Sequence, residues 1–223
     1  MVIFEGKNLN ILNKANNPIF RNFSFEIKSH EIWMASGPNG IGKSSLWEAL
    51  IGIRKIESGQ LFLEQNEITK LMPADRVRMG MKYISQNNAL FDDLSVFDNL
   101  MIIAESLLPY SLRINAVNNA VKTFYLEAIL KNKAINLSGG QRRRVELAKI
   151  MIGKSTLILL DEPFAAIDEE YTEKIANIFK SLAKQGASFL INDHNTNMVR
   201  NIANYCIHLG SSEKTLVTLE KIA

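Results

Sequence analysis

The sequence predicts an α/β fold in which helices cover both faces of a largely parallel sheet. Three observations support this prediction. Short apolar runs typical of buried strands, such as 157–160 and 187–192, alternate with stretches of helical periodicity. A glycine-rich turn follows one apolar run, and a pair of acids ends another. The chain has 223 residues, 47% of them apolar and 22% charged, which suits a folded unit with a substantial core and excludes disorder.

Charge and cysteine content narrow the class of protein further. Lys and Arg number 26 against 23 Asp and Glu, so the net charge of +3 is too small to indicate a nucleic-acid partner, and none is expected. The single cysteine, Cys206, has apolar neighbours that predict a buried thiol in a reducing compartment. No run approaches the roughly 18 apolar residues that a membrane span needs, and no secretory signal is apparent. We therefore expect a cytoplasmic protein.

The first third of the chain is expected to be mainly β-structure. Strands are predicted at 2–4, 23–27, 31–36 and 60–63, where apolar and polar residues alternate or run together. A helix is expected from Lys43 to about Ile53, and Gly52 helps to end it.

The middle of the chain predicts a compact helical insertion. From about residue 98 to 130, Leu, Ala, Asn and Lys at helical spacing replace the β-type alternation, and Pro109 and Ser111 mark a break between helices. Beyond it, helices are expected at 141–152, 169–185 and 196–204, and strands at 156–160 and 187–192. We expect one domain over 1–223, with a core of about 1–86 and 137–223 and a helical subdomain of about 87–136.

A phosphate-binding motif provides the strongest local signal. The sequence GPNGIGKS at 37–44 fits G-x-x-x-x-G-K-[ST] and lies between an apolar strand and a helix, as the motif requires. The loop backbone can point its N–H groups at phosphate oxygens, and Lys43 can reach the β and γ phosphates. The hydroxyl of Ser44 is a candidate ligand for Mg²⁺. The nucleotide-binding residues expected here are Gly37, Pro38, Asn39, Gly40, Ile41, Gly42, Lys43, Ser44 and Ser45.

An acidic pair complements this loop. The apolar run LILL at 157–160 places Asp161 and Glu162 at the carboxyl edge of the sheet, where open α/β sheets bind their ligands. We expect Asp161 to lie on the metal side and Glu162 to act as the general base that polarises the attacking water.

A second helix start has the features of an anion site. Ser138 is expected to cap the helix, and the N–H groups of Gly139, Gly140 and Gln141 are then available to a phosphate. A capped amphipathic helix without any ligand would give the same local pattern, so the residues alone leave both interpretations open.

Together, GPNGIGKSS, LSGGQ, LILLDEP and a later histidine resemble the ATP-binding subunit of ABC transporters over nearly the whole chain. The resemblance implies an ATPase fold with an N-terminal antiparallel β subdomain, a mainly parallel core sheet and a short helical insertion. It implies that two subunits pair head to tail, either as copies of this chain or with a paralogue. Each ATP–Mg²⁺ would then be held between the phosphate loop of one subunit and Ser138, Gly139, Gly140 and Gln141 of the other.

Three further positions resemble family motifs. Gln86 looks like the glutamine that ligates the metal and senses the membrane partner, and His194 like the histidine that contacts the γ-phosphate. Asp168 resembles the aspartate that helps to join two subunits. The family also carries an aromatic residue on the loop near 13–15 that stacks on adenine, whereas here the residues are Asn-Lys-Ala.

The resemblance also implies transmembrane permease subunits as partners and a place on the inner face of the cell membrane. The residues in and around the motifs are most similar to those of lipopolysaccharide-export ATPases and their branched-chain amino-acid relatives. This similarity favours lipopolysaccharide or lipid export. A haem-exporter ATPase of cytochrome c maturation and an amino-acid importer remain alternatives, and a weakly hydrolytic ATP-gated clamp is the alternative from another class. A membrane subunit is expected to contact the groove after Gln86. The apolar residues of this segment are Leu90, Phe91, Leu94, Val96 and Phe97. Most of them are expected to lie in the core, and a few exposed ones would form the contact.

Overall fold

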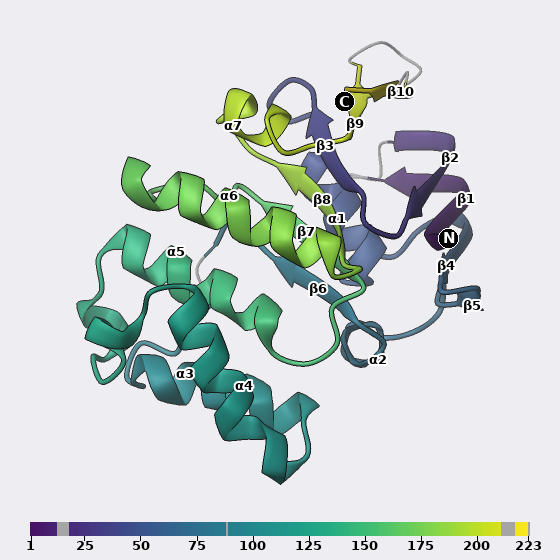
Figure 1. Ribbon diagram of the computed structural model, residues 1–223. Helices are drawn as coiled ribbons and strands as arrows, with labels where there is room; N and C mark the ends of the chain where they lie inside the picture. Colours follow the sequence, from purple (N-terminus) through teal and green to yellow (C-terminus); the bar gives the residue numbers. More distant parts are fainter. Residues whose placement is uncertain (13–17, 88, 211–216, 223) are drawn as a thin grey trace.

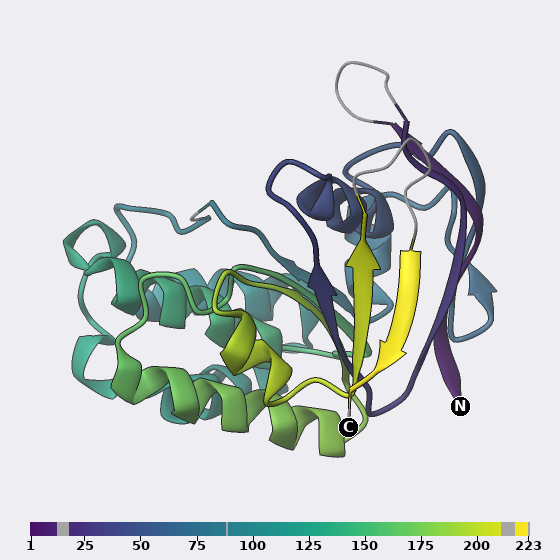
Figure 2. The same cartoon turned by 90° about the horizontal axis from the view of Figure 1, so that it is seen from above.

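The computed structural model describes residues 1–12, 18–87, 89–210 and 217–222. It consists of two β-sheets and a group of helices packed in layers (Figure 1). Helix α1 lies between the two sheets, and the remaining long helices lie on the far side of the larger sheet (Figure 2). The α/β architecture predicted from the sequence is confirmed.

The larger sheet has six strands in the order β10-β9-β3-β8-β7-β6. All neighbouring pairs are parallel except β9 and β10, which are antiparallel. The strands are β3 (Ile32–Ser36), β6 (Met81–Ile84), β7 (Leu157–Asp161), β8 (Ser188–Asn192), β9 (Tyr205–Leu209) and β10 (Val217–Lys221).

The smaller sheet is antiparallel and has the order β2-β1-β4-β5. This is the N-terminal β subdomain that the resemblance implied. Its strands are β1 (Val2–Leu12), β2 (Pro18–Lys28), β4 (Ser58–Leu63) and β5 (Asn66–Glu67).

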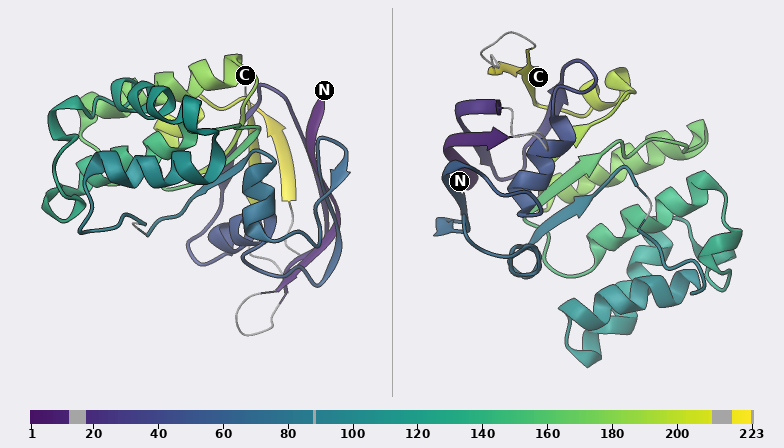
Figure 3. Two further views of the ribbon diagram at one scale, coloured as in Figure 1. Left: turned by 90° about the horizontal axis from the view of Figure 1, so that it is seen from below. Right: turned by 180° about the vertical axis from the view of Figure 1, so that it is seen from behind.

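Helices follow the strands of the larger sheet and form a group at the opposite end of the molecule from the smaller sheet (Figure 3). The α-helices are α1 (Lys43–Ile51), α2 (Pro73–Arg78), α3 (Val96–Leu107), α4 (Tyr110–Thr123), α5 (Gly139–Ala148), α6 (Glu169–Lys184) and α7 (Thr196–Arg200). Short 3₁₀ turns lie at Glu127–Ile129, Ala134–Asn136 and Lys149–Met151. None of the helices within the described part of the chain has the length and apolar character to cross a bilayer.

Strand β7 shows how the sheet separates two hydrophobic cores. Leu157 and Leu159 face the core that contains α1 and the smaller sheet, whereas Ile158 and Leu160 face the core of α3 to α7. All four side chains are fully buried. A strand covered on both faces reads as a continuous apolar run, which is why LILL predicted a central strand.

Several elements differ from those expected from the sequence. The third helix predicted after the insertion ends at Arg200 instead of 204, and β9 then begins at Tyr205. Strands β9 and β10 and the six-residue helix α2 were not predicted. Cys206 lies in β9 and is 2% exposed, as expected for a buried thiol.

One lysine of the larger sheet is buried. Lys82 lies in β6, and its ammonium group donates a hydrogen bond to the Ile152 carbonyl oxygen at 2.9 Å. Burial lowers the pKa of Lys82 to about 8 from 10.5, because the charged form is poorly solvated. Between pH 8 and 10.5 the unfolded chain binds more protons than the folded one. The buried charge therefore lowers the free energy of unfolding by its full amount below pH 8, and this penalty disappears as the pH rises to 10.5.

We predict that Lys82→Met raises the free energy of unfolding at pH 7 by about 2 kcal/mol, since it removes a desolvated charge at the cost of one hydrogen bond. The advantage should shrink as the pH rises above 8, where wild-type Lys82 loses its proton. Urea unfolding at pH 7 and at a pH above 9 measures both effects, with the exposed Lys131→Met as the control. A difference between variant and wild type that is the same at both pH values would contradict the role of this charge.

Candidate functional site

The carboxyl ends of β3, β6, β7 and β8 meet at one edge of the larger sheet, where they surround a cavity of about 400 Å³. Residues from four separate segments of the chain line it. They are Asn39, Gly40, Gly42, Lys43, Ser44, Ser45, Gln86, Glu162, Asn192 and His194. The fold therefore brings Gln86, Glu162 and His194 to the phosphate loop, whereas the predicted loop residues Gly37, Pro38 and Ile41 do not line the cavity.

The phosphate loop leads directly from β3 into α1. Gly40 and Gly42 have φ values of +78° and +107°, in the left-handed region that favours glycine. No side chain caps α1, so the first amides of this helix remain available to an anion. The Lys43 ammonium donates hydrogen bonds to the carbonyl oxygens of Gly37 at 2.7 Å and Pro38 at 3.1 Å, which places the lysine inside the curl of the loop.

The charge of Lys43 is set by two opposing effects. Partial burial lowers its pKa, and the nearby carboxylates of Asp161 and Glu162 act to raise it. A cation held at this point by carbonyl oxygens, next to uncapped helix amides, forms a strongly anion-attracting site.

Glu162 lies at the centre of the polar contacts of the cavity. One carboxylate oxygen accepts a hydrogen bond from the Gln86 amide at 2.9 Å, and the other lies 3.0 Å from Nε2 of His194. The Glu162 side chain is largely buried, whereas that of His194 is 65% exposed. Residues predicted separately from three segments thus form one contiguous group around a single carboxylate.

Asp161 lies behind this group and does not itself line the cavity. It is 2% exposed, and its Oδ1 accepts a hydrogen bond from the Asn192 amide at 2.7 Å. Asp161, Ser44 and Gln86 offer oxygen atoms, which are the ligands that Mg²⁺ prefers. Within the described ranges, no three or more His, Cys, Asp or Glu side chains gather as a metal site. These residues fit a magnesium ion that takes its remaining ligands from phosphate and water.

The second predicted anion site lies outside the cavity. Ser138 caps α5 as expected: its hydroxyl accepts from the Gln141 N–H at 3.3 Å, and the Gln141 side chain accepts from the Ser138 N–H at 3.0 Å. The Gln141 amide was expected to be free but is therefore already paired. The exposed end of the helix consequently offers Gly139 and Gly140, and no residue of this turn lines the cavity of its own chain.

Asp168, the aspartate expected to help join two subunits, lies at the start of α6, away from the cavity, and its carbonyl oxygen accepts a hydrogen bond from the Thr172 hydroxyl at 3.2 Å. Just before it, Ala166 has a left-handed φ of +58°. Its carbonyl oxygen lies so close to Gly140 that a Cβ atom there would approach it to 2.5 Å. The turn formed by residues 138–141 at the start of α5, which we call the signature turn, is therefore in direct contact with this loop of the same chain.

Two other predictions concern the surface. Of the apolar residues after Gln86, Val96 is fully buried, whereas Phe91 is 57% exposed. Residues 13–15, where the sequence has Asn-Lys-Ala in place of the adenine-stacking aromatic of the family, lie outside the described residues. His30 and His208, to which no role was given, bond to the Ala183 carbonyl oxygen and to Ser36 and Glu220, respectively.

Sequence reasoning gave no role to two residues that shape the site. Asn192 lines the cavity because β8 pairs with β7 in a register that places it opposite Asp161. Arg143, on α5, donates hydrogen bonds to the backbone carbonyl oxygens of both Asp161 and Glu162. Asn192 could have been suspected, because it ends a strand predicted beside the one that ends in Asp161 and Glu162. No local feature of the sequence indicated the role of Arg143.

Comparisons with known proteins agree with this geometry. The sequence model of the ABC transporter family matches residues 20–165. The lipopolysaccharide export system ATP-binding protein LptB of Acidithiobacillus ferridurans is 34% identical over 195 residues, which cover 86% of this chain and 81% of that protein. A probable branched-chain amino acid transport ATP-binding protein, LivF of Archaeoglobus fulgidus, is 36% identical over 151 residues, covering 67% and 64%.

The fold is also found among solved structures. The structure of an ATP-binding cassette, MJ0796, described as a dimeric post-hydrolysis state bound to ADP and Pi, superposes with a TM-score of 0.86. The superposition covers 99% of each chain at 22% identity. Motifs, cavity, family match and fold agree, and this chain belongs to the ABC transporter family as an ATP-hydrolysing subunit of the ABC type.

Proposed function

We propose that this chain hydrolyses ATP with Mg²⁺ in the cavity at the carboxyl edge of the larger sheet. The contacts of Glu162 carry the proposal, because Gln86 and His194 both hold its carboxylate where it faces the phosphate loop. The amides of the loop and Lys43 bind and orient the triphosphate, and Glu162 accepts a proton from the attacking water. His194 contacts the γ-phosphate, and Ser44, Gln86 and Asp161 hold the metal. Bound Mg²⁺ neutralises phosphate charge during the transfer.

Two copies of the chain, or one copy and a paralogue, are inferred to pair head to tail. The support is that each chain has two candidate phosphate-binding helix starts that lie apart, with only one of them at the cavity. A signature turn that binds phosphate must then serve the cavity of another subunit. Asp168 would contribute to the contact between the two subunits from the loop beside this turn.

The partners proposed for the dimer are transmembrane permease subunits, which would hold it at the inner, cytoplasmic face of the membrane. Exposed Phe91 supports a contact on the segment after Gln86. The chain would act as one domain, in which residues of about 87–136 form a helical subdomain and the remainder forms the core.

Lipopolysaccharide or lipid export is the transport reaction that we favour. The support is 34% identity to LptB over most of both chains, and the LivF match keeps amino-acid import as a second candidate. The cavity itself recognises only phosphate and metal, so cargo selection would reside in the membrane subunits.

We predict that Glu162→Gln lowers ATP hydrolysis by about 100-fold or more, because the amide cannot accept the proton of the water. ATP binding should persist and should stabilise the dimer. Phosphate release and light scattering measure the two effects, with exposed Glu169→Gln as the control. Negligible hydrolysis by wild type and variant alike would favour the clamp over the enzyme.

Mixing two inactive variants tests the shared site. Lys43→Ala disables a phosphate loop, whereas Ser138→Glu keeps a helix-capping acceptor but repels phosphate. A mixed dimer would retain one intact site, so we expect a mixture to recover up to about a quarter of the wild-type rate if pairing is random. Each variant alone is the control. If the mixture hydrolyses and binds no more ATP than either variant alone, the phosphate loop and the signature turn act in the site of the same chain, and the shared site is contradicted.

The membrane contact can be tested by capture from detergent-solubilised membranes. We expect Phe91→Ala to lose the membrane subunits that purify with the wild-type chain, because it removes an exposed aromatic anchor. Tyr110→Ala, which removes an even more exposed aromatic from α4, is the control. Adding lipopolysaccharide or amino acids to the captured complex and measuring phosphate release then distinguishes the two cargo classes. Equal capture by both variants would place the contact elsewhere.

A further inference from the structure

Arg143 connects the helix that begins with the signature turn to the ends of two core strands. Its side chain is 6% exposed. Nη2 donates hydrogen bonds to the carbonyl oxygens of Asp161 at 2.5 Å and Glu162 at 2.9 Å, and Nη1 donates to that of Ser85 at 2.8 Å. One guanidinium therefore fixes the backbone at Glu162 and at the residue before Gln86.

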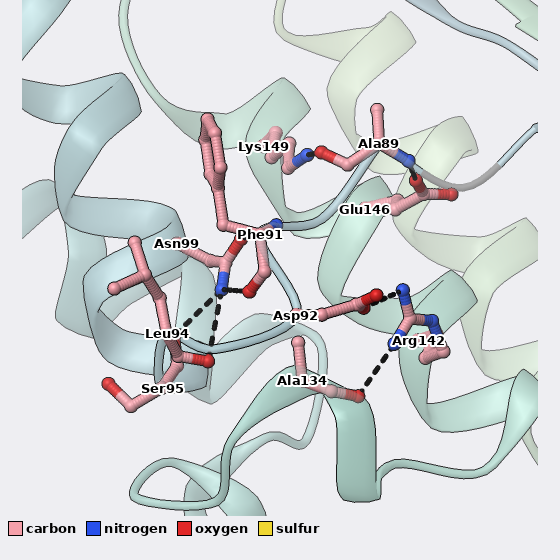
Figure 4. A network of polar contacts seen from close by, with 10 residues as sticks. All are labelled: Ala89, Phe91, Asp92, Leu94, Ser95, Asn99, Ala134, Arg142, Glu146 and Lys149. Atoms are coloured by element: carbon pink, nitrogen blue, oxygen red, sulfur yellow. Dashed lines mark hydrogen bonds and ion pairs between the residues drawn. The ribbon is translucent and has the colours of Figure 1, made fainter.

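The same guanidinium is paired with a buried carboxylate. Nη1 of Arg143 lies 3.0 Å from Glu146, whose side chain is 3% exposed. Glu146 also accepts a hydrogen bond from the Ala89 N–H, and Lys149 donates to the Ala89 carbonyl oxygen at 2.9 Å (Figure 4). Because Glu146 carries this second contact, α5 holds the chain on both sides of Gln86.

A second ion pair extends these contacts towards the surface. Arg142 donates to Asp92 at 2.7 Å and to the Ala134 carbonyl oxygen at 2.7 Å (Figure 4). Asp92 follows the exposed Phe91, so the proposed membrane contact is joined to the same helix.

The distance from the signature turn to these contacts is short. Arg143 follows the capping residue Ser138 by five positions in one continuous helix, a rise of about 8 Å. A helix of this kind moves as a rigid body, so a displacement of the turn also displaces the Arg143 backbone. The guanidinium must then either carry the strand ends with it or lose hydrogen bonds.

One group of Arg143 is unsatisfied. Its Nε–H is buried and has no hydrogen-bond partner among the described residues. Buried donors without partners are rare and costly, so this group makes the present position of the guanidinium less favourable than a fully paired one would be.

We propose that Arg143 is a positioning residue that ties the signature turn of a chain to that chain's own Glu162 and Gln86. This rests on the proposed dimer, in which the turn binds the ATP of the other subunit's site. Closure of the turn on that ATP moves α5, and Arg143 passes the movement to the hydrolytic residues of its own site. Binding at one site thereby raises the rate of hydrolysis at the other but is not required for it, so a dimer with one intact site retains activity.

The test uses a mixed dimer with one intact site. A chain with Lys43→Ala supplies only its signature turn, and an affinity-tagged partner chain with Ser138→Glu supplies the phosphate loop and Glu162. Arg143→Lys is placed in one chain or the other. We expect about a tenfold or greater loss of kcat when it lies in the chain that supplies Glu162, with KM for ATP within about twofold, because misplacing a reacting group affects chemistry more than binding. In the other chain it should leave the rate within about twofold.

Arg144→Lys is the matched control. Arg144 lies on the same helix and is similarly buried, but it donates to the carbonyl oxygens of Phe124 and Tyr125 and packs over the Tyr171 ring. The Arg144→Lys variant should lower thermal stability about as much as Arg143→Lys does, and should leave both mixed dimers active. In the homodimer, Arg143→Lys should reduce the Hill coefficient for ATP towards 1, whereas Arg144→Lys should not.

Equal loss of rate from either chain, loss only from the chain supplying the signature turn, or no loss at all would overturn the proposal. A wild-type Hill coefficient in the Arg143→Lys homodimer would overturn the link between sites. If the parent mixed dimer, with Arg143 intact in both chains, releases no phosphate, it is the shared-site dimer that fails. The two failures are therefore distinguishable.

Discussion

The geometry of the site depends on how the chain leaves the sheet after β7. Glu162 has a left-handed φ of +55°, which costs a residue with a side chain about 1 to 2 kcal/mol. Its N–H donates to the Asn192 carbonyl oxygen at 2.6 Å, and its own carbonyl oxygen accepts from Arg143. These bonds hold the strained turn, which aims the carboxylate at the phosphate loop. Since Gln86 and His194 both contact that carboxylate, an error in this one turn would displace all three side chains.

The charges around the cavity are balanced for a substrate that carries its own counter-ion. Lys43 and the uncapped start of α1 attract a triphosphate, whereas Asp161 and Glu162 repel it. Asp161 is buried, so its charge is poorly screened by water. A triphosphate that binds with Mg²⁺ offsets this repulsion, and a bare one does not. The acidic pair would thereby favour the proposed metal complex of the nucleotide over the free anion.

The sequence predicted those features that are encoded within a few neighbouring residues. The loop at 37–44, the acids after LILL and the capping of α5 each depend on local spacing and a known backbone geometry. Asn192 and Arg143 escaped prediction because their roles arise from strand register and from packing between segments distant in the sequence. The strand β9 was missed for a related reason: a five-residue apolar run becomes a strand because β3 lies beside it with open hydrogen-bonding groups.

In the proposed transporter, helix α5 would connect the nucleotide site to the membrane partner. Its first turn has the features of a phosphate site, its buried face holds the backbone at Asp161 and Glu162, and its outer face pairs with Asp92 beside the exposed Phe91. Three surfaces with different ligands are thus fixed to one rigid element of ten residues. A displacement of one of these surfaces would disturb the other two, because the buried Arg143 cannot shift without breaking its hydrogen bonds to carbonyl oxygens. In the proposed assembly, cargo chemistry would vary with the membrane subunit while the coupling within this chain stayed the same.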